Sequence, residues 1–145
     1  MGGRRHPRGT RFVIVVDTNI LIGYAVPNHS LHRACVALHA ADPNWVVPPL
    51  WRYECLNVLA KLVRAGQLPL SKAQGLLLYL TEALKENERF PDEALILDIA
   101  AKHRVSAYDG TYVALADSLG CMLVTDDKEV LEKFPSMTRS PSSFL

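Results

Sequence analysis

Hydrophobic residues along this chain fall into short continuous runs and longer stretches in which they recur every three or four positions. Residues 12–16 and 121–124 are continuous apolar runs, typical of strands buried on both faces of a parallel sheet. Shorter runs predict further strands at residues 45–47 and 105–107. Helical periodicity fills most of the sequence between these four segments.

Seven helices are predicted from that periodicity and from the residues that flank it. They cover residues 20–25, 31–38, 50–65, 71–84, 92–103, 109–119 and 130–134. We expect Ser30 to cap the second helix, Pro49 to start the third and Gly66 to end it. Residues 138–145 carry too weak a pattern to predict an element. Because strands alternate with helices, we expect an α/β fold with a mostly parallel sheet.

Length and charge predict one domain preceded by a basic arm. A chain of 145 residues has the usual size of one domain, and residues 12–145 can fold without a disulfide or structural metal. Residues 1–11 contain four arginines, and we interpret them as a flexible, solubilising arm. The rest of the chain carries 12 Lys and Arg against 15 Asp and Glu, which is not the basic balance of a general nucleic-acid binder.

Nothing in the sequence indicates export or membrane insertion. The apolar runs fall far short of the roughly 20 residues of a membrane-spanning helix, and the basic N-terminus lacks the features of a secretory signal. The cysteines form no CxxC pair, which argues against a zinc or redox motif and predicts small buried side chains (Cys35, Cys55 and Cys121). We therefore expect a cytoplasmic protein.

Acidic residues follow the predicted strands at the point where each strand ends. Asp17 comes directly after the first strand, Asp109 follows the strand at 105–107, and Asp127 lies three residues beyond the end of the run 121–124. The functional crevice of an open parallel sheet lies outside the carboxyl ends of its strands. We therefore expect these three carboxylates to converge at one edge of the sheet.

A fourth acid, Glu54, lies on the predicted helix 50–65 beside its apolar stripe. We expect Glu54 at the rim of the buried face, braced by a hydrogen bond from Asn57 three residues later. Carboxylates brought together repel one another unless a cation neutralises them. Ligand sets made of oxygen alone suit Mg²⁺ or Mn²⁺, and such a site suits phosphodiester cleavage. The hypothesis is therefore a site for one or two such ions.

The same acids also fit structural roles. Asp17 or Asp109 alone could cap a helix, and Asp126 with Asp127 could form the acidic first turn that a helix dipole favours. Glu54 alone could be a solvated helical residue. From the residues alone, the shared metal site and these separate roles both stay open.

Histidines, aromatic residues and basic residues that could have a functional role also have ordinary structural interpretations. We expect the histidines near the second helix to lie on the surface or to cap it, since no third metal ligand is nearby (His29, His32 and His39). Helical spacing favours core packing over base stacking for three aromatic residues (Trp51, Tyr53 and Tyr112). Three basic residues share the helix of Glu54 and could contact RNA phosphates or simply form a solvated face (Arg52, Lys61 and Arg64).

Four sequence strings resemble those of the PIN-domain nucleases. They are VDTNIL at residues 16–21, the helix with Glu54 and Asn57, SAYDGTYVALA at 106–116 and LVTDD at 123–127. Their order matches that of the family over nearly the whole of residues 12–134. The third string is especially similar to the VapC-type toxins of toxin–antitoxin pairs.

This resemblance implies a three-layer α/β/α fold whose central parallel sheet has four or five strands. It implies a Mg²⁺- or Mn²⁺-dependent endoribonuclease, usually a homodimer, that a cognate antitoxin neutralises. Carried over by position, the catalytic and metal-binding acids are Asp17, Glu54, Asp109 and Asp127, with Asp126 as the alternative to the last of them. Thr18 and Thr125 resemble the hydroxyl residues that steady neighbouring acids, and Asn19 matches the polar third position.

Several competing classes can be weighed against this one. Haloacid-dehalogenase-type phosphatases need a second Asp two positions after the first, where this chain has Asn19. Receiver domains need paired acids near the first strand, and these are absent too. An RNA-processing nuclease that is not a toxin, and a PIN-like module that binds RNA or protein without cutting, both remain open.

Overall fold

Four parallel strands form the centre of the computed structural model, which describes residues 12–145. Along the sheet the order is β2, β1, β3, β4, and every neighbouring pair is parallel. The strands are β1 (Ile14–Val16), β2 (Trp45–Val46), β3 (Leu123–Val124) and β4 (Thr138–Arg139). Val15 is aligned with Val46 on one side and with Leu123 on the other, so β1 is central. The basic arm predicted for residues 1–11 lies outside the described residues.

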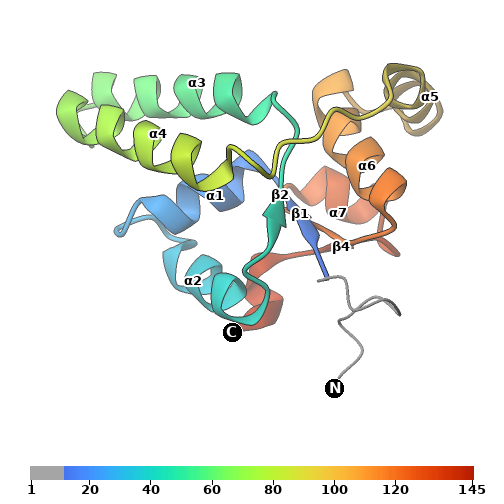
Figure 1. The fold of residues 1–145 in the computed structure, drawn as a ribbon, viewed down its shortest axis with the longest axis horizontal. Helices are drawn as coiled ribbons and strands as arrows, with labels where there is room; N and C mark the ends of the chain where they lie inside the picture. Colours follow the sequence, from blue (N-terminus) through green and yellow to red (C-terminus); the bar gives the residue numbers. More distant parts are fainter. Residues whose placement is uncertain (1–11) are drawn as a thin grey trace.

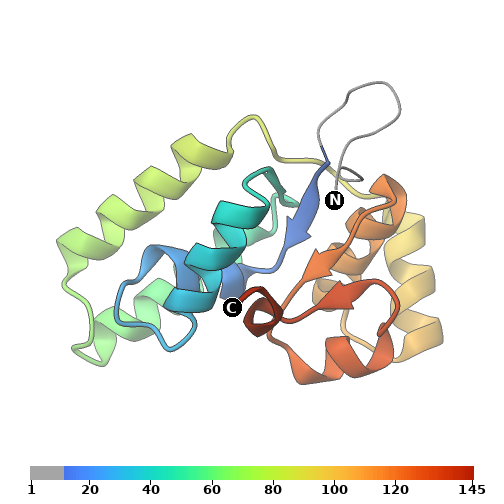
Figure 2. The same ribbon diagram turned by 90° about the horizontal axis from the view of Figure 1, so that it is seen from below.

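Helices cover both faces of this sheet (Figures 1 and 2). They are α1 (Thr18–Ala25), α2 (His32–Ala41), α3 (Trp51–Arg64), α4 (Leu70–Leu84), α5 (Glu93–His103), α6 (Ala107–Leu119), α7 (Lys128–Lys133) and the 3₁₀ helix η1 (Pro141–Phe144). Ile14 and Val16 pack with α1 to α4, whereas Val15 packs with α5 to α7. Alternation along one strand thus separates two hydrophobic cores. The predicted three-layer α/β/α fold is confirmed, with four strands in the described part.

The strand predicted at residues 105–107 is wrong. Arg104 ends α5 in the left-handed conformation (φ 58°), and the backbone N–H of Val105 still bonds to Ala100. Ser106 then caps α6, because its side chain accepts a hydrogen bond from the N–H of Asp109 at 3.0 Å. Asp109 therefore lies inside the first turn of α6 rather than at its start.

Two further expectations differ from the structure. The cap of α2 is Leu31 and not Ser30, and the N–H of Leu31 donates instead to Nδ1 of His29 at 3.0 Å. The weakly patterned tail contributes β4 and η1. β4 could be missed because a two-residue strand has too few positions to show alternation. Within residues 12–145, no helix has the length and apolar character needed to cross a membrane.

Candidate active site

The four predicted acids line one open cavity of about 350 Å³ at the carboxyl ends of the strands, here called the acid cavity. It is lined by Asp17, Thr18, Asn19, Ile22, His29, Glu54, Asn57, Val58, Asp109 and Asp127. The acids come from the end of β1, from α3, from the first turn of α6 and from the start of α7. The topology therefore brings together four side chains that are up to 110 positions apart. Asp126 is exposed and does not line this cavity.

Asp17 is held by hydrogen bonds to both of its carboxylate oxygens. The backbone N–H of Thr18 donates to Oδ1 at 2.7 Å, and Oγ1 of Thr125 donates to Oδ2 at 2.8 Å. Burial raises the pKa of Asp17 to about 6, an effect that these two hydrogen bonds oppose and that the nearby charges of Glu54 and Asp109 increase. Asp17 is therefore an acid whose negative charge lacks a compensating cation among residues 12–145.

Glu54 is fixed by two hydroxyl groups from other helices. Its Oε1 accepts from Oγ1 of Thr18 at 2.9 Å and from Oη of Tyr112 at 2.7 Å, and the two hydroxyl oxygens are themselves 2.7 Å apart. Burial, followed by the charge of Glu54, raises the pKa of Tyr112 well above its usual range, so this phenol stays protonated. Tyr112 therefore acts as a hydrogen-bond donor to Glu54.

Helical spacing predicts Tyr112 in the core but not its contact with the site. The core assignment is correct for Tyr112 and Trp51, which are 2% and 0% exposed, and it is wrong for Tyr53, which is 74% exposed. A signal for Tyr112 was available in its position three residues after Asp109, on the same side of one helix. The predicted brace from Asn57 to Glu54 does not form among the described residues, although Asn57 does line the cavity.

Asp109 and Asp127 belong to the first turns of two helices. Burial raises the pKa of Asp109, and the charges of Asp127, Glu129 and Glu54 raise it further. Asp127 caps α7, with Oδ1 accepting from the N–H of Val130 at 3.1 Å. Asp127 therefore combines a helix-capping role with the cavity-lining role, whereas Asp109 lines the cavity from the first turn of a helix that Ser106 caps.

Thr125 connects three parts of the site although it is completely buried. Besides its bond to Asp17, its Oγ1 accepts from the backbone N–H of Asp127 at 3.1 Å and lies 3.5 Å from Nδ2 of Asn19. Oδ1 of Asn19 accepts from the N–H of Asp126 at 3.3 Å. These contacts tie the loop after β3 to the start of α1, which fixes the separation between Asp17 and Asp127.

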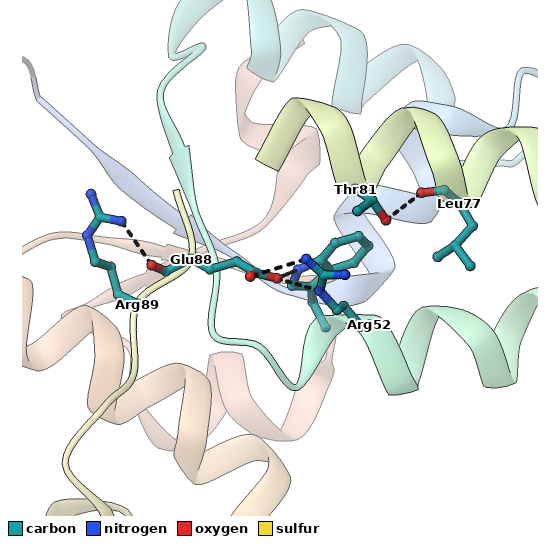
Figure 3. A network of polar contacts seen from close by, with 6 residues as sticks. Arg52, Leu77, Thr81, Glu88 and Arg89 are labelled. Carbon is teal, nitrogen blue, oxygen red and sulfur yellow. Dashed lines mark hydrogen bonds and ion pairs between the residues drawn. The ribbon is translucent and has the colours of Figure 1, made fainter. Parts of the chain in front are cut away.

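The three basic residues of α3 lie outside the acid cavity. Nε of Arg52 is 2.8 Å from Oε2 of Glu88 (Figure 3). Nε1 of Trp51 donates to the same oxygen at 2.6 Å. Arg52 thus anchors α3 to the segment after α4. Lys61 and Arg64 are exposed near the other end of α3.

The donor set of the cavity fits a hard divalent cation. It offers four carboxylates, and of residues 12–145 no lysine or arginine lines it. Burial, followed by the charges of neighbouring carboxylates, raises the pKa values of Asp17 and Asp109. As the side chains lie, no three Asp, Glu, His or Cys groups of the described part surround a single point closely enough to hold an ion. The carboxylates would therefore have to move closer together to share one ion.

Comparison with known proteins agrees with this arrangement. The PIN domain model matches residues 14–135. The chain belongs to the PIN-domain family. This PIN domain is 33% identical over 127 residues to Ribonuclease VapC3 of Pyrobaculum aerophilum, which covers 86% of the chain and 96% of that protein. It is 35% identical over 108 residues to Exonuclease VapC9 of the same organism, covering 69% and 80%.

A solved structure has the same fold. The crystal structure of PAE2754 from Pyrobaculum aerophilum superposes with a TM-score of 0.70, covering 90% of this chain and 91% of that one at 23% identity. The resemblance to VapC-type PIN proteins predicted from four sequence strings is therefore confirmed.

Proposed function

We propose that this protein is a Mg²⁺- or Mn²⁺-dependent endoribonuclease. The single observation that carries the proposal is the acid cavity, where four carboxylates meet without a lysine or arginine from residues 12–145. The likeness to Ribonuclease VapC3 supports RNA as the substrate. The chemistry of the donor set supports one or two hard cations.

In this proposal Asp17, Glu54 and Asp109 hold the principal ion, and Asp127 assists it or a second one. A bound ion supplies an activated water and a positive charge against the scissile phosphate. The side chains around the acids keep their oxygens in place: Thr125 orients Asp17, and Tyr112 with Thr18 orients Glu54. No protein side chain acts as a covalent nucleophile.

The biological role that we propose is that of a toxin in a toxin–antitoxin pair, with a cognate antitoxin protein and a homodimeric state. The names of the VapC relatives support this role. Lys61 and Arg64 are exposed on α3 and are proposed to contact RNA phosphates, whereas Arg52 is already engaged by Glu88. An antitoxin gene directly upstream would separate a toxin from an RNA-processing nuclease.

Incubation with total RNA tests the activity. We expect cleavage in Mg²⁺ and in Mn²⁺ and none in EDTA, and we expect Glu54→Gln to lose most of the activity in both metals. Cleavage that persists in EDTA would remove the metal from the mechanism. Metal titration without any binding would favour the alternative of a non-cutting RNA- or protein-binding module.

An exonuclease is a second candidate, because one relative is named Exonuclease VapC9. A covalently closed circular RNA separates the two activities, since an exonuclease needs a free end. We expect the circle to be linearised in Mg²⁺. An intact circle beside a degraded linear RNA of the same sequence would establish the exonuclease instead.

A further inference from the structure

His29 lies among the four carboxylates, although its sequence position suggested only a surface or capping role. It belongs to the loop between α1 and α2 and lines the acid cavity. In the described part of the chain, it is the one lining residue with an imidazole, and no other lining side chain can become a cation. This placement, together with its hydrogen bonds, gives His29 a function that a capping role alone does not explain.

Three hydrogen bonds fix the position of His29. Its backbone N–H donates to the carbonyl of Val26 and its own carbonyl accepts from the N–H of His32, both at 3.0 Å. Its ring Nδ1 accepts from the N–H of Leu31, also at 3.0 Å. Gly23 makes room for the end of the loop and for α2, because a Cβ there would lie 3.1 Å from Cβ of Leu31 and 2.8 Å from Sγ of Cys35. The imidazole is therefore held before any ligand arrives.

The bond from Leu31 also decides the tautomer of His29. A ring nitrogen that accepts a hydrogen bond carries no proton, so in the neutral ring the proton is on Nε2. Nε2 forms no hydrogen bond within residues 12–145. No buried side-chain nitrogen or oxygen in that part lacks a partner, so Nε2 is open to solvent. His29 thus presents a free N–H donor.

This tautomer makes His29 a donor and not a metal ligand. A histidine that binds a metal uses an unprotonated nitrogen and donates from the other one. In His29 the unprotonated Nδ1 is already occupied by Leu31, and Nε2 carries the proton. A neutral N–H also has an advantage over lysine or arginine in this place, because it attracts a phosphate oxygen without forming an ion pair with the carboxylates.

We propose that His29 is a substrate-binding residue whose Nε2–H donates to a phosphate oxygen of the RNA in the acid cavity. The proposal rests on the proposed nuclease function and adds a direct contact to the substrate. The donor belongs to the loop between α1 and α2. It is needed because the four acids alone would repel the phosphate.

Two substitutions separate the structural bond of His29 from its free donor. His29→Asn keeps an oxygen near Nδ1 that can accept from Leu31 and removes the donor at Nε2, whereas His29→Gln puts an amide N–H near the position of Nε2. We expect His29→Asn to lower kcat/KM on single-stranded RNA about 10- to 100-fold, mainly through KM, as for the loss of one hydrogen bond to a charged group. We expect His29→Gln to recover part of that loss.

A matched control lies three residues later, at the start of α2. Nδ1 of His32 contacts the carbonyl of Gly23, and His32 does not line the acid cavity. We expect His32→Asn to keep kcat/KM within about 2-fold of the wild type. Equal losses in His29→Asn and His32→Asn would indicate a loop defect and overturn the proposal, as would a His29→Asn protein with unchanged kcat/KM.

A measurement without catalysis distinguishes this proposal from the nuclease assignment. Proton–nitrogen correlation spectra of the imidazoles report the tautomer, and we expect Nε2 of His29 to be protonated and to shift when inorganic phosphate is added in Mg²⁺. A proton on Nδ1, or no response to phosphate, would overturn the role of His29 whether or not the protein cuts RNA. Weaker Mg²⁺ binding by His29→Asn in calorimetry would assign His29 to the metal and likewise overturn it. Failure of the wild type to cut any RNA would instead remove the nuclease function.

Discussion

The two halves of the acid cavity are held in different ways. Asp17 and Glu54, the inner pair, are bonded to the side-chain hydroxyls of Thr125 and Tyr112, which lie 108 and 58 positions away in sequence. Asp109 and Asp127, the outer pair, belong to helix starts whose hydrogen bonds reach only two or three residues along the chain. The inner pair thus depends on contacts made only in the completed tertiary fold, although Asp17 also caps α1 through the N–H of Thr18, whereas local helix-start chemistry alone fixes the outer pair.

This difference predicts separate consequences for substitutions in the two pairs. Removal of an inner acid or of its hydroxyl partner disturbs oxygens that are already fixed before an ion binds. Removal of an outer acid leaves that arrangement intact. We therefore expect the largest losses of activity from the inner pair.

Asp17→Asn is expected to have the largest effect. The amide cannot supply the negative charge, while its shape and its Oδ1 acceptor are retained. We expect kcat/KM on RNA in Mg²⁺ or Mn²⁺ to fall by a factor on the order of 1,000, comparable to losses measured for single groups that stabilise developing charge. Circular dichroism should give an unchanged spectrum. Full activity in Mn²⁺ would remove Asp17 from the site.

Tyr112→Phe tests how Glu54 is positioned. The substitution removes one of the two hydroxyls on Oε1 and leaves Oγ1 of Thr18 in place. We expect kcat/KM to fall about 10- to 30-fold, and the free energy of unfolding to fall by about 1 kcal/mol for the lost hydrogen bond. Tyr79→Phe is the control, because Tyr79 is 54% exposed and lies outside the cavity. Equal activities of the two variants would contradict a positioning role for Tyr112.

Asp127→Asn and Asp126→Asn compare the two acids that the sequence could not separate. Asparagine caps helices about as well as aspartate, so Asp127→Asn removes charge from the cavity without unwinding α7. We expect about a 10-fold loss of kcat/KM for Asp127→Asn and less than a 2-fold change for Asp126→Asn, which is exposed outside the cavity. The reverse order would make Asp126 the fourth acid.

The sequence predicted the outer pair and the fold more completely than the inner network. Helix-start residues and continuous apolar runs are local signals, and they located Asp109, Asp127 and the strand before Asp17 correctly enough to predict one shared edge of the sheet. The strand expected at 105–107 does not form, because the side chain of Ser106 accepts a hydrogen bond from the N–H of Asp109 and caps a helix there.

Contacts between distant elements could not be predicted in this way. Tyr112 has an ordinary place on the buried side of α6, and only the packing of α6 near α3 brings its hydroxyl to Glu54. His29 reaches the cavity from the loop between α1 and α2, whose end at Leu31 packs closely against Gly23 of α1, and that is a property of the folded loop. The periodicity of hydrophobic residues predicts neither the contact of Tyr112 with Glu54 nor the position of His29.

The smallest predicted effect is on the stability of the metal-free protein, where the charge of Asp17 should cost free energy. Its folded-state pKa of about 6 lies above the unfolded value of 3.8, so the folded state binds more protons between these two pH values. The contribution of Asp17 to the free energy of unfolding therefore decreases as pH rises from about 4 to about 6 and is constant above that. Asp17→Asn lacks this dependence.

Urea unfolding in EDTA measures the difference. At pH 4.5 the free energies of unfolding of the variant and the wild type should be similar, apart from a constant offset. At pH 7 the variant should be more stable than the wild type by about 1–2 kcal/mol beyond that offset. Mg²⁺ at pH 7 should reduce that advantage, because it binds the wild-type carboxylates and stabilises the folded state by mass action. A difference between the two proteins that stays the same at every pH would mean that the Asp17 carboxylate is already compensated inside the metal-free protein, and the inner pair would then have no electrostatic need for an ion.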